Sequence, residues 1–172
     1  PAGTRLSARA AGDRTATNIR VVLYLFGGGG APAGPIGSKV TTYGVTSVPA
    51  GVQVTPGVFT MGSWTEVTSS TSAAHFAFFP SMQPPDGDTS LTPIKATHLD
   101  MGYGPVGNEG HLVGGQQNYL YFVDTNETQG GPWPIMPVYQ SLPAGSRLLA
   151  RLGTHNALDT VPHQEVAIHA VS

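Results

Sequence analysis

Residues 143–171, PAGSRLLARLGTHNALDTVPHQEVAIHAV, contain the pattern that decides the fold class. A Pro-Ala-Gly turn opens the stretch, because proline and glycine favour the backbone dihedrals of tight turns. A short apolar strand follows over 147–152, then a polar loop, then a second strand over 165–171. The stretch has no helical period. It predicts two β-strands that are introduced by a turn and joined by a loop.

The first of these strands has two distinct faces. Side chains alternate between the faces of a strand, so residues four apart lie on the same side. Arg147 and Arg151 therefore share one face, and Leu148 and Ala150 share the other. We expect the arginines to make polar contacts.

The rest of the chain repeats this arrangement of short strands and turns. Windows of ten residues without Gly or Pro are few, and those that occur alternate or are rich in β-branched side chains. Turn sequences stand at Pro80, 84–87, 102–107 and 130–132. The pattern predicts an all-β, jelly-roll-like β-sandwich of antiparallel strands. The predicted strands are 4–10, 17–26, 39–45, 52–55, 60–71, 75–79, 94–101, 119–124, 135–142, 147–152 and 165–171.

The composition excludes several classes of protein. With 172 residues, a net charge of -2 and 10% charged residues, the chain has too few cations to bind nucleic acid through a basic patch. It has no cysteine, which excludes disulfides, thiolate metal sites and a cysteine nucleophile. The longest apolar run, 21–26, is far shorter than a membrane span. We therefore expect neither a nucleic acid nor a membrane as partner, and a surface that faces other proteins.

The two ends of the chain resemble each other. Residues 1–10, PAGTRLSARA, match residues 143–152, PAGSRLLARL, at seven of ten positions. Each copy is followed by a polar loop and a second strand, over 20–26 in the first and 165–171 in the second. The offset is that of a whole domain rather than of a solenoid repeat. Chance similarity between two turn-and-strand sequences is the alternative.

This repeat suggests a division of the chain into three parts. Residues 1–27 form either the last hairpin of a truncated preceding repeat or an N-terminal arm that completes a sheet here or in a neighbouring subunit. Residues 28–37 are a Gly/Pro linker, and residues 38–172 form the β-sandwich domain. Both interpretations leave strand edges that favour assembly.

Three blocks of sequence carry a family resemblance. GSWTEV at 62–67, GNE at 107–109 and LPAGSRLLAR at 142–151 resemble, in order and spacing, structural proteins of tailed-bacteriophage virions. Such proteins are described as minor tail, fibre or capsid decoration proteins. The similarity covers residues 60–172, about two thirds of the chain. It implies a jelly-roll-like β-sandwich in the virion, without enzymatic activity and without catalytic residues.

The sequence offers few candidates for chemistry. His98 with Asp100, and His163 with Glu165, have the spacing to share one face of a strand, but zinc needs three or four convergent ligands. The acidic turn at 86–88 lacks the other oxygen ligands of a calcium loop. No Gly-x-Ser-x-Gly elbow occurs. We predict no catalytic residues, no metal and no cofactor. A hydrolase, whose acids would be Glu66, Asp100 or Glu109, is the least favoured class.

Eight residues are predicted to serve packing or an interface. The arginines of the two repeat copies supply polar contacts, and large aromatic residues on strands and in loops supply apolar area. They are Arg5, Arg9, Trp64, Tyr119, Tyr121, Trp133, Arg147 and Arg151. The two tyrosines share a strand face that suits core, interface or sugar binding, and Trp133 stands between two prolines in a loop.

Together these features predict a non-enzymatic structural component of a tailed-phage virion. Its partners would be other virion proteins, such as major capsid or tail proteins, and copies of itself. The alternative is a carbohydrate- or receptor-binding module of a tail fibre, in which Trp133 stacks on a glycan receptor.

Overall fold

The computed structural model describes residues 39–45, 51–83, 94–123, 128–130, 138–154 and 164–172. They belong to one compact unit, Ile36–Ser172. The predicted hairpin or arm at 1–27 and the linker at 28–37 lie outside the described residues, as do the acidic turn at 86–88 and the side chain of His163.

Strands alone make up the regular structure of the described residues, which confirms the all-β prediction. Accordingly, nothing in this described part is a helix of the length and apolarity that crossing a membrane requires. The strands are β1 (Val40–Tyr43), β2 (Val52–Val54), β3 (Pro56–Val58), β4 (Thr65–Thr68), β5 (His75–Gln83), β6 (Ile94–Tyr103), β7 (Gly110–Val123), β8 (Thr128–Gly130), β9 (Val138–Leu142), β10 (Leu148–Thr154) and β11 (Gln164–Val171).

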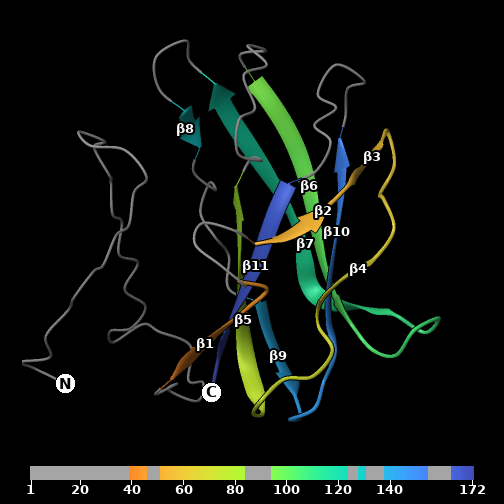
Figure 1. The fold of residues 1–172 in the computed structure, drawn as a ribbon, viewed down its shortest axis with the longest axis vertical. Coiled ribbons are helices and arrows are strands. Elements are labelled where there is room, and N and C mark those ends of the chain that lie inside the picture. The colour runs from red at the N-terminus through yellow and green to blue at the C-terminus, as the bar shows by residue number, and fades with distance from the viewer. Residues whose placement is uncertain (1–38, 46–50, 84–93, 124–127, 131–137, 155–163) are drawn as a thin grey trace, which may run out of the picture. The chain divides into compact units, whose positions relative to one another are not determined.

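The strands form two sheets that pack together as a β-sandwich (Figure 1). Sheet A has the order β1-β11-β5-β9, and β2 also pairs with β11. Sheet B has the order β3-β10-β6-β7-β8, and β4 also pairs with β10. Only the β3–β10 pair is parallel among these described pairings. The sandwich is as predicted, whereas its jelly-roll connectivity stays a prediction.

Strand boundaries differ from the prediction in two instructive places. Pro80 was expected to end a strand, but β5 continues through it to Gln83. There Pro80 pairs with Ile168 of β11, and the described pairing of β5 with β9 ends at Phe78. A proline is tolerated in a strand where no ladder hydrogen bond needs its missing N–H. Strand β7 begins at Gly110, well before the predicted start at Tyr119, because it forms a long hairpin with β6.

The core lies between the sheets and is built by alternate residues of their central strands. Leu148, Ala150 and Leu152 of β10 face Val166 and Ile168 of β11, and all five are fully buried. Leu148 and Ala150 were predicted to share one face of the strand, and the structure shows that this face is the inward one. β10 and β11, which are consecutive in the sequence, thus supply opposite sides of one core. The residues between these core residues therefore point outward from each sheet.

The turn before β10 has the conformation that its sequence predicts. Gly145 adopts a left-handed φ of 82°, which a residue without Cβ adopts freely. The Gly145 amide donates to the Thr71 carbonyl and the Thr71 amide to the Ser146 carbonyl, each over 2.8 Å. Thr71 Oγ1 donates to the Pro143 carbonyl over 3.2 Å and accepts from the Ser146 amide. These contacts hold the start of β10 in place.

Candidate functional site

The outward face of sheet B carries a buried carboxylate. Asp100 stands in β6 between Leu99 and Met101, which both belong to the core, so its side chain points away from the core. Its cross-strand neighbour in β10 is Arg151, which lies opposite the core for the same reason. Asp100 is nevertheless 0% exposed. A buried charge is costly without a partner of opposite sign, so its contacts determine what this face can do.

Two side chains converge on one oxygen of Asp100. Arg151 donates to Oδ2 from Nε over 3.0 Å and places Nη2 2.9 Å from the same atom. His111 of β7 places Nδ1 2.8 Å from Oδ2 as well. Oδ1 is buried and has no hydrogen-bond partner within the described part of the chain. The described polar contacts of this carboxylate are therefore all made by Oδ2.

Trp64 covers this ion pair. The Arg151 guanidinium carbon lies 4.3 Å from the centroid of the indole ring, which is a cation–π contact. The His111 ring meets the indole edge-on, with centroids 5.6 Å apart. Trp64 rests on Gly102, where a Cβ atom would come within 2.6 Å of the indole. We call Trp64, Asp100, His111 and Arg151 the Trp64 cluster.

A break in strand register brings His111 to the cluster. Asp100 pairs with Gln116, yet Gly102, two residues later, pairs with His111. Residues 112–115 of β7 therefore bulge opposite Met101. The bulge shifts His111 next to Gly102, where its ring reaches both Asp100 and Trp64. His111, which the sequence spacing did not connect with Asp100, is thus its described histidine neighbour.

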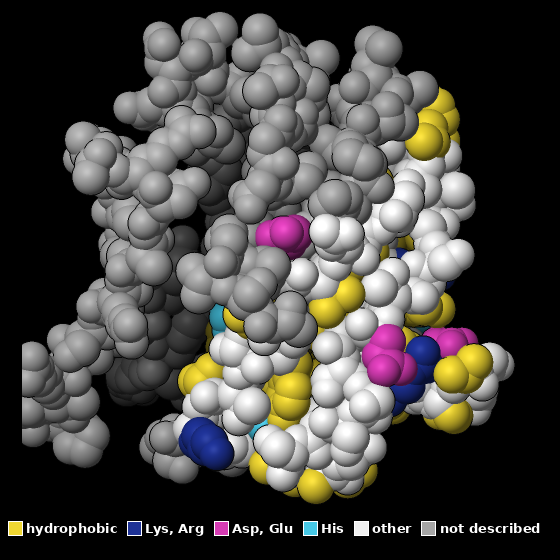
Figure 2. Space-filling view, in the orientation of Figure 1, with side chains coloured by type: hydrophobic (Ala, Val, Ile, Leu, Met, Phe, Trp, Pro, Cys, Tyr) yellow, Lys and Arg dark blue, Asp and Glu magenta, His cyan; other side chains and the backbone are white. Residues whose placement is uncertain are grey.

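A second group of charges lies on the same face and is centred on Arg147. Its Nε donates to Glu66 Oε2 over 2.6 Å, and its Nη1 donates to the Gly104 carbonyl over 3.1 Å. Nη1 also lies 3.4 Å from Glu109 Oε1, which accepts the Gly107 amide. Arg147, Glu66 and Glu109, which we call the Arg147 clamp, join β4, β10 and the β6–β7 turn. Figure 2 shows charges of both signs gathered together on an otherwise weakly charged surface.

The ion pairs of the clamp are reflected in its acid–base properties. The pKa of Glu109 lies below its usual range. The hydrogen bond from the Gly107 amide is the largest cause, and the backbone amide of Glu109 and the Arg147 guanidinium act in the same direction. The hydrogen bond to Glu66 raises the pKa of Arg147. Both groups therefore stay charged at neutral pH, and the clamp remains an ion pair.

Sheet A carries two histidines that both contact β1. On its outward side, His169 of β11 shares hydrogen bonds of 2.8 Å with Thr42 Oγ1 and 3.1 Å with Ser81 Oγ. On its inward side, His75 of β5 shares a 2.8 Å hydrogen bond with the Tyr43 hydroxyl. Burial lowers the pKa of both histidines. Both are neutral at neutral pH.

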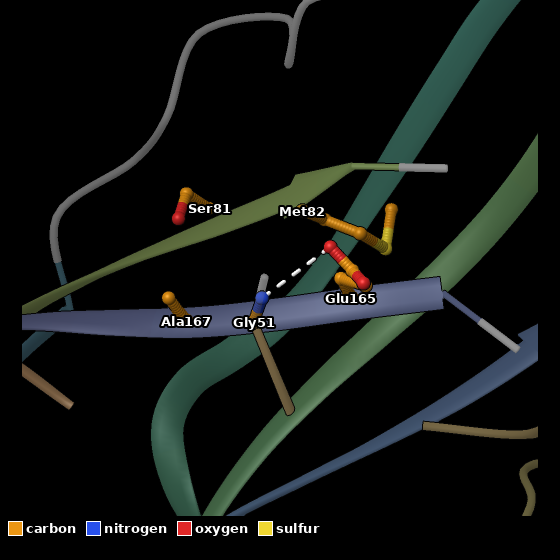
Figure 3. A pocket seen from close by; sticks show the side chains of 5 residues that line it. All are labelled: Gly51, Ser81, Met82, Glu165 and Ala167. Atoms are coloured by element: carbon orange, nitrogen blue, oxygen red, sulfur yellow. Dashed lines mark hydrogen bonds between the residues drawn. The ribbon is translucent and has the colours of Figure 1, made fainter. Parts of the chain in front are cut away.

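A small hollow lies beside β5 and β11 (Figure 3). Gly51, Ser81, Met82, Glu165 and Ala167 line it. The Gly51 amide donates to Glu165 Oε2 over 3.4 Å, so the carboxylate reaches back to the backbone. Its volume is about 70 Å³, whereas pockets for small molecules typically measure about 300–1,000 Å³. The hollow is large enough for a water molecule or a small ion only.

These arrangements have limited chemical reach. Ser81 and His169 are paired as a nucleophile and base are, but a threonine hydroxyl occupies the place of the orienting carboxylate. Across the described ranges, no group of three His, Cys, Asp or Glu side chains is placed to hold a metal ion. The carboxylates of the Trp64 cluster and the Arg147 clamp are used in ion pairs. Their evident effect is to fix the outward face of sheet B.

The structure unites three of the eight predicted interface residues on one face. Trp64 and Arg151 belong to the Trp64 cluster, and Arg147 centres the clamp. Tyr119 and Tyr121 lie in β7, but their side chains are outside the description. Arg5, Arg9 and Trp133 lie outside the described residues altogether.

Sequence reasoning overlooked several residues that matter here. It did not connect Asp100 with Arg151 or His111, nor Arg147 with Glu66 and Glu109. The nearly equal numbers of cationic and acidic residues are compatible with ion pairs but do not say which residues pair. Arg147 and Glu66 are 81 positions apart, so their contact depends on strand register. The two histidines that contact β1 gave no sequence signal either.

Exposed apolar side chains gather at the terminal strands of the two sheets. Val40 on β1 is 61% exposed and Tyr139 on β9 is 60% exposed, and these strands end sheet A. Phe59 directly follows β3, one of the two terminal strands of sheet B, and is 71% exposed with a left-handed φ of 57°. None of β1, β3 and β9 contains a charged residue. Such edges lack the charges that usually discourage pairing with another sheet.

Comparison with known proteins gave no relatives: no family model, no curated protein and no solved structure matches the chain.

Proposed function

We propose that this protein is a non-enzymatic structural component of a tailed-phage virion, a decoration or minor tail protein that acts by protein–protein assembly. The terminal strands of sheet A, β1 and β9, which contain neither a charged residue nor a proline and carry the exposed side chains of Val40 and Tyr139, are the observation that carries the proposal. Edge strands with free N–H and C=O groups pair with neighbouring chains unless charges, prolines or bulges prevent it. The resemblance of residues 60–172 to virion proteins supports the same conclusion.

The polar groups support assembly rather than catalysis. Asp100, Arg147 and Arg151 are engaged with side chains of their own sheet, which stiffens the outward face of sheet B. A stiff face loses little conformational entropy when it docks against another protein. Partners in this view are other virion proteins and copies of the same chain.

Self-association of the full chain tests the edge proposal. Tyr139→Lys places a charge on edge strand β9, and Val40→Lys does the same on β1. Both should lower the weight-average mass measured by sedimentation velocity across a dilution series. Val106→Lys is the matched control, because Val106 is 82% exposed but stands in the β6–β7 turn, away from a terminal strand. Equal masses for all four proteins would contradict the proposal.

Particle composition tests the virion location. Mass spectrometry of purified phage particles should find peptides of this chain at a fixed ratio to the capsid or tail proteins. Deleting residues 1–27 should weaken incorporation into particles, since these residues would serve as the arm. Equal incorporation of the shortened chain would contradict the arm but leave the edge proposal standing.

The glycan-binding alternative depends on Trp133, which lies outside the described residues. Trp64 gives it no support, because its ring is already packed on Gly102 and Arg151. A glycan array separates the two functions: binding that disappears with Trp133→Ala would favour receptor recognition.

A further inference from the structure

Strand β1 is the terminal strand of sheet A and is held by a histidine on each face. It has four residues, and its described backbone pairing is with β11 alone, from Val40↔Val171 to Tyr43↔Ile168. Its backbone pairing is extended by two hydrogen bonds between Lys39 and Ser172, of 3.0 and 3.1 Å. A strand this short, with one described neighbour, is the part of sheet A that detaches with the least loss of contacts.

The two histidines contact successive residues of β1. His169 shares its 2.8 Å hydrogen bond with Thr42 on the outward side, where Ser81 of β5 occupies its other nitrogen at 3.1 Å. His75 shares its 2.8 Å hydrogen bond with Tyr43 on the core side. The Tyr43 hydroxyl also accepts the Ser72 amide over 2.9 Å, so Tyr43 is fixed from two directions.

Few described charges surround these imidazoles. Burial is the main cause that lowers the pKa of His75; the Val171 backbone opposes this, and the cation of Lys39 adds to it. Burial alone lowers the pKa of His169. Tyr43 is the titratable side chain that touches His75, and Glu165 lies four residues before His169 on β11 and shares the hollow with Ser81.

We propose that β1 is an acid-sensitive latch: when His75 and His169 take up protons, β1 detaches from β11 while the rest of the sandwich stays folded. An imidazolium held away from water is costly. If β1 leaves, the buried His75 and the partly buried His169 each lose a neighbour and gain contact with water. The detached strand uncovers the edge of β11 over Ile168–Val171, beyond the part that pairs with β2, and this edge then offers its backbone groups to another strand. This regulation goes beyond the proposed assembly function, since it does not depend on which partner binds.

The direction of the effect follows from the lowered pKa values. Well above about pH 6.5 both histidines are neutral whether β1 is attached or detached, so acidity has no influence there. Below that pH the histidines of the detached form bind protons more readily than those of the attached form, whose pKa values are lowered. Detachment of β1 therefore becomes more frequent. Between pH 7.5 and 5.5 each histidine that stays neutral in the attached form raises the opening constant by about 10-fold, and the two together by up to about 100-fold.

Hydrogen exchange of the full chain, followed by mass spectrometry, tests the latch. After correction for the intrinsic pH dependence of exchange, peptides covering 39–45 should lose up to about 100-fold protection between pH 7.5 and 5.5. A peptide covering 148–154, in the centre of sheet B, should keep its protection. His169→Gln should reduce the loss in β1 to about 10-fold. His111→Gln, a histidine variant on the other sheet, should leave the loss in β1 as it is.

Two results would overturn the latch. Unchanged protection of β1 at pH 5.5 would show that the attachment of β1 does not depend on the protonation of His75 and His169. Equal loss in β1 and β10 would show that acid unfolds the whole sandwich instead. His75→Gln should also reduce the loss in β1 to about 10-fold. His75 is buried, so this variant can fail to fold, and the test then depends on His169→Gln and on the comparison of β1 with β10.

Discussion

Replacing Arg151 by methionine is the most direct test of the Trp64 cluster. Methionine preserves much of the aliphatic length of arginine but removes both of its contacts with Asp100 Oδ2. Asp100 is 0% exposed, so water cannot take the place of the guanidinium without rearrangement. His111 is then the one described side chain left on the carboxylate.

The expected loss of stability follows from burial. Removing one partner of a buried ion pair costs about 3–5 kcal/mol. The lost stacking on Trp64 adds about 0.5–1 kcal/mol. The remaining half-exposed His111 offsets about 0–1 kcal/mol, as surface ion pairs do. We therefore expect Arg151→Met to lower the free energy of unfolding by about 4 kcal/mol, and the melting temperature by roughly 8–16 °C.

Urea denaturation, followed by tryptophan fluorescence and circular dichroism, measures this loss. Arg147→Met is the matched control: Glu66 is 44% exposed, so solvent compensates its carboxylate, and Glu109, 18% exposed, keeps the hydrogen bond from the Gly107 amide. Its loss should be clearly smaller. In the double variant Asp100→Asn/Arg151→Met the carboxylate charge is absent as well, and the two changes should be non-additive by about 2 kcal/mol. A loss below about 1 kcal/mol for Arg151→Met, or one equal to the control, would refute the reasoning.

Three further substitutions test other parts of the structure. Gly102→Ala should displace the indole of Trp64, because the new Cβ would lie 2.6 Å from it, and a shift of the tryptophan emission maximum with reduced stability would show this. Leu152→Ala, at a site with 0% exposure, should cost about 2–5 kcal/mol in urea denaturation. Phe59→Gly should raise the free energy of unfolding by up to about 1 kcal/mol, because glycine adopts the left-handed φ without strain and little buried area is lost. It should also lower self-association in the ultracentrifuge. A lower free energy of unfolding for Phe59→Gly would indicate that the ring packs in the native protein.

The prediction of the fold succeeded where local patterns were sufficient. Alternation in the segment after Pro143 placed Leu148 and Ala150 on one face of the strand and the arginines on the other, and the structure shows that the apolar face is the inward one. It failed at Pro80, because a proline is compatible with a strand wherever no ladder hydrogen bond needs its missing N–H, and the described pairing of β5 with β9 ends before Pro80. Neighbouring strands are not visible in a local window.

The candidate site could be anticipated only in part. Trp64, Arg147 and Arg151 were marked as contact residues from their types and faces, and the structure places them on one sheet face. The partners of the arginines were missed, because the carboxylates come from β4, β6 and the β6–β7 turn. His111 reaches Asp100 only through a bulge in β7, and a bulge of this kind has no local sequence signature here.

By itself the sequence determined the class of structure: short alternating segments, frequent Gly and Pro and a lack of charge permit strands and turns and little else. The tertiary structure alone decided which charges meet, that Asp100 is buried on an outward face, and that two histidines hold β1. The reason is physical. Side-chain alternation is set by the backbone of one strand, whereas burial and ion pairing depend on the register between strands that are distant in sequence.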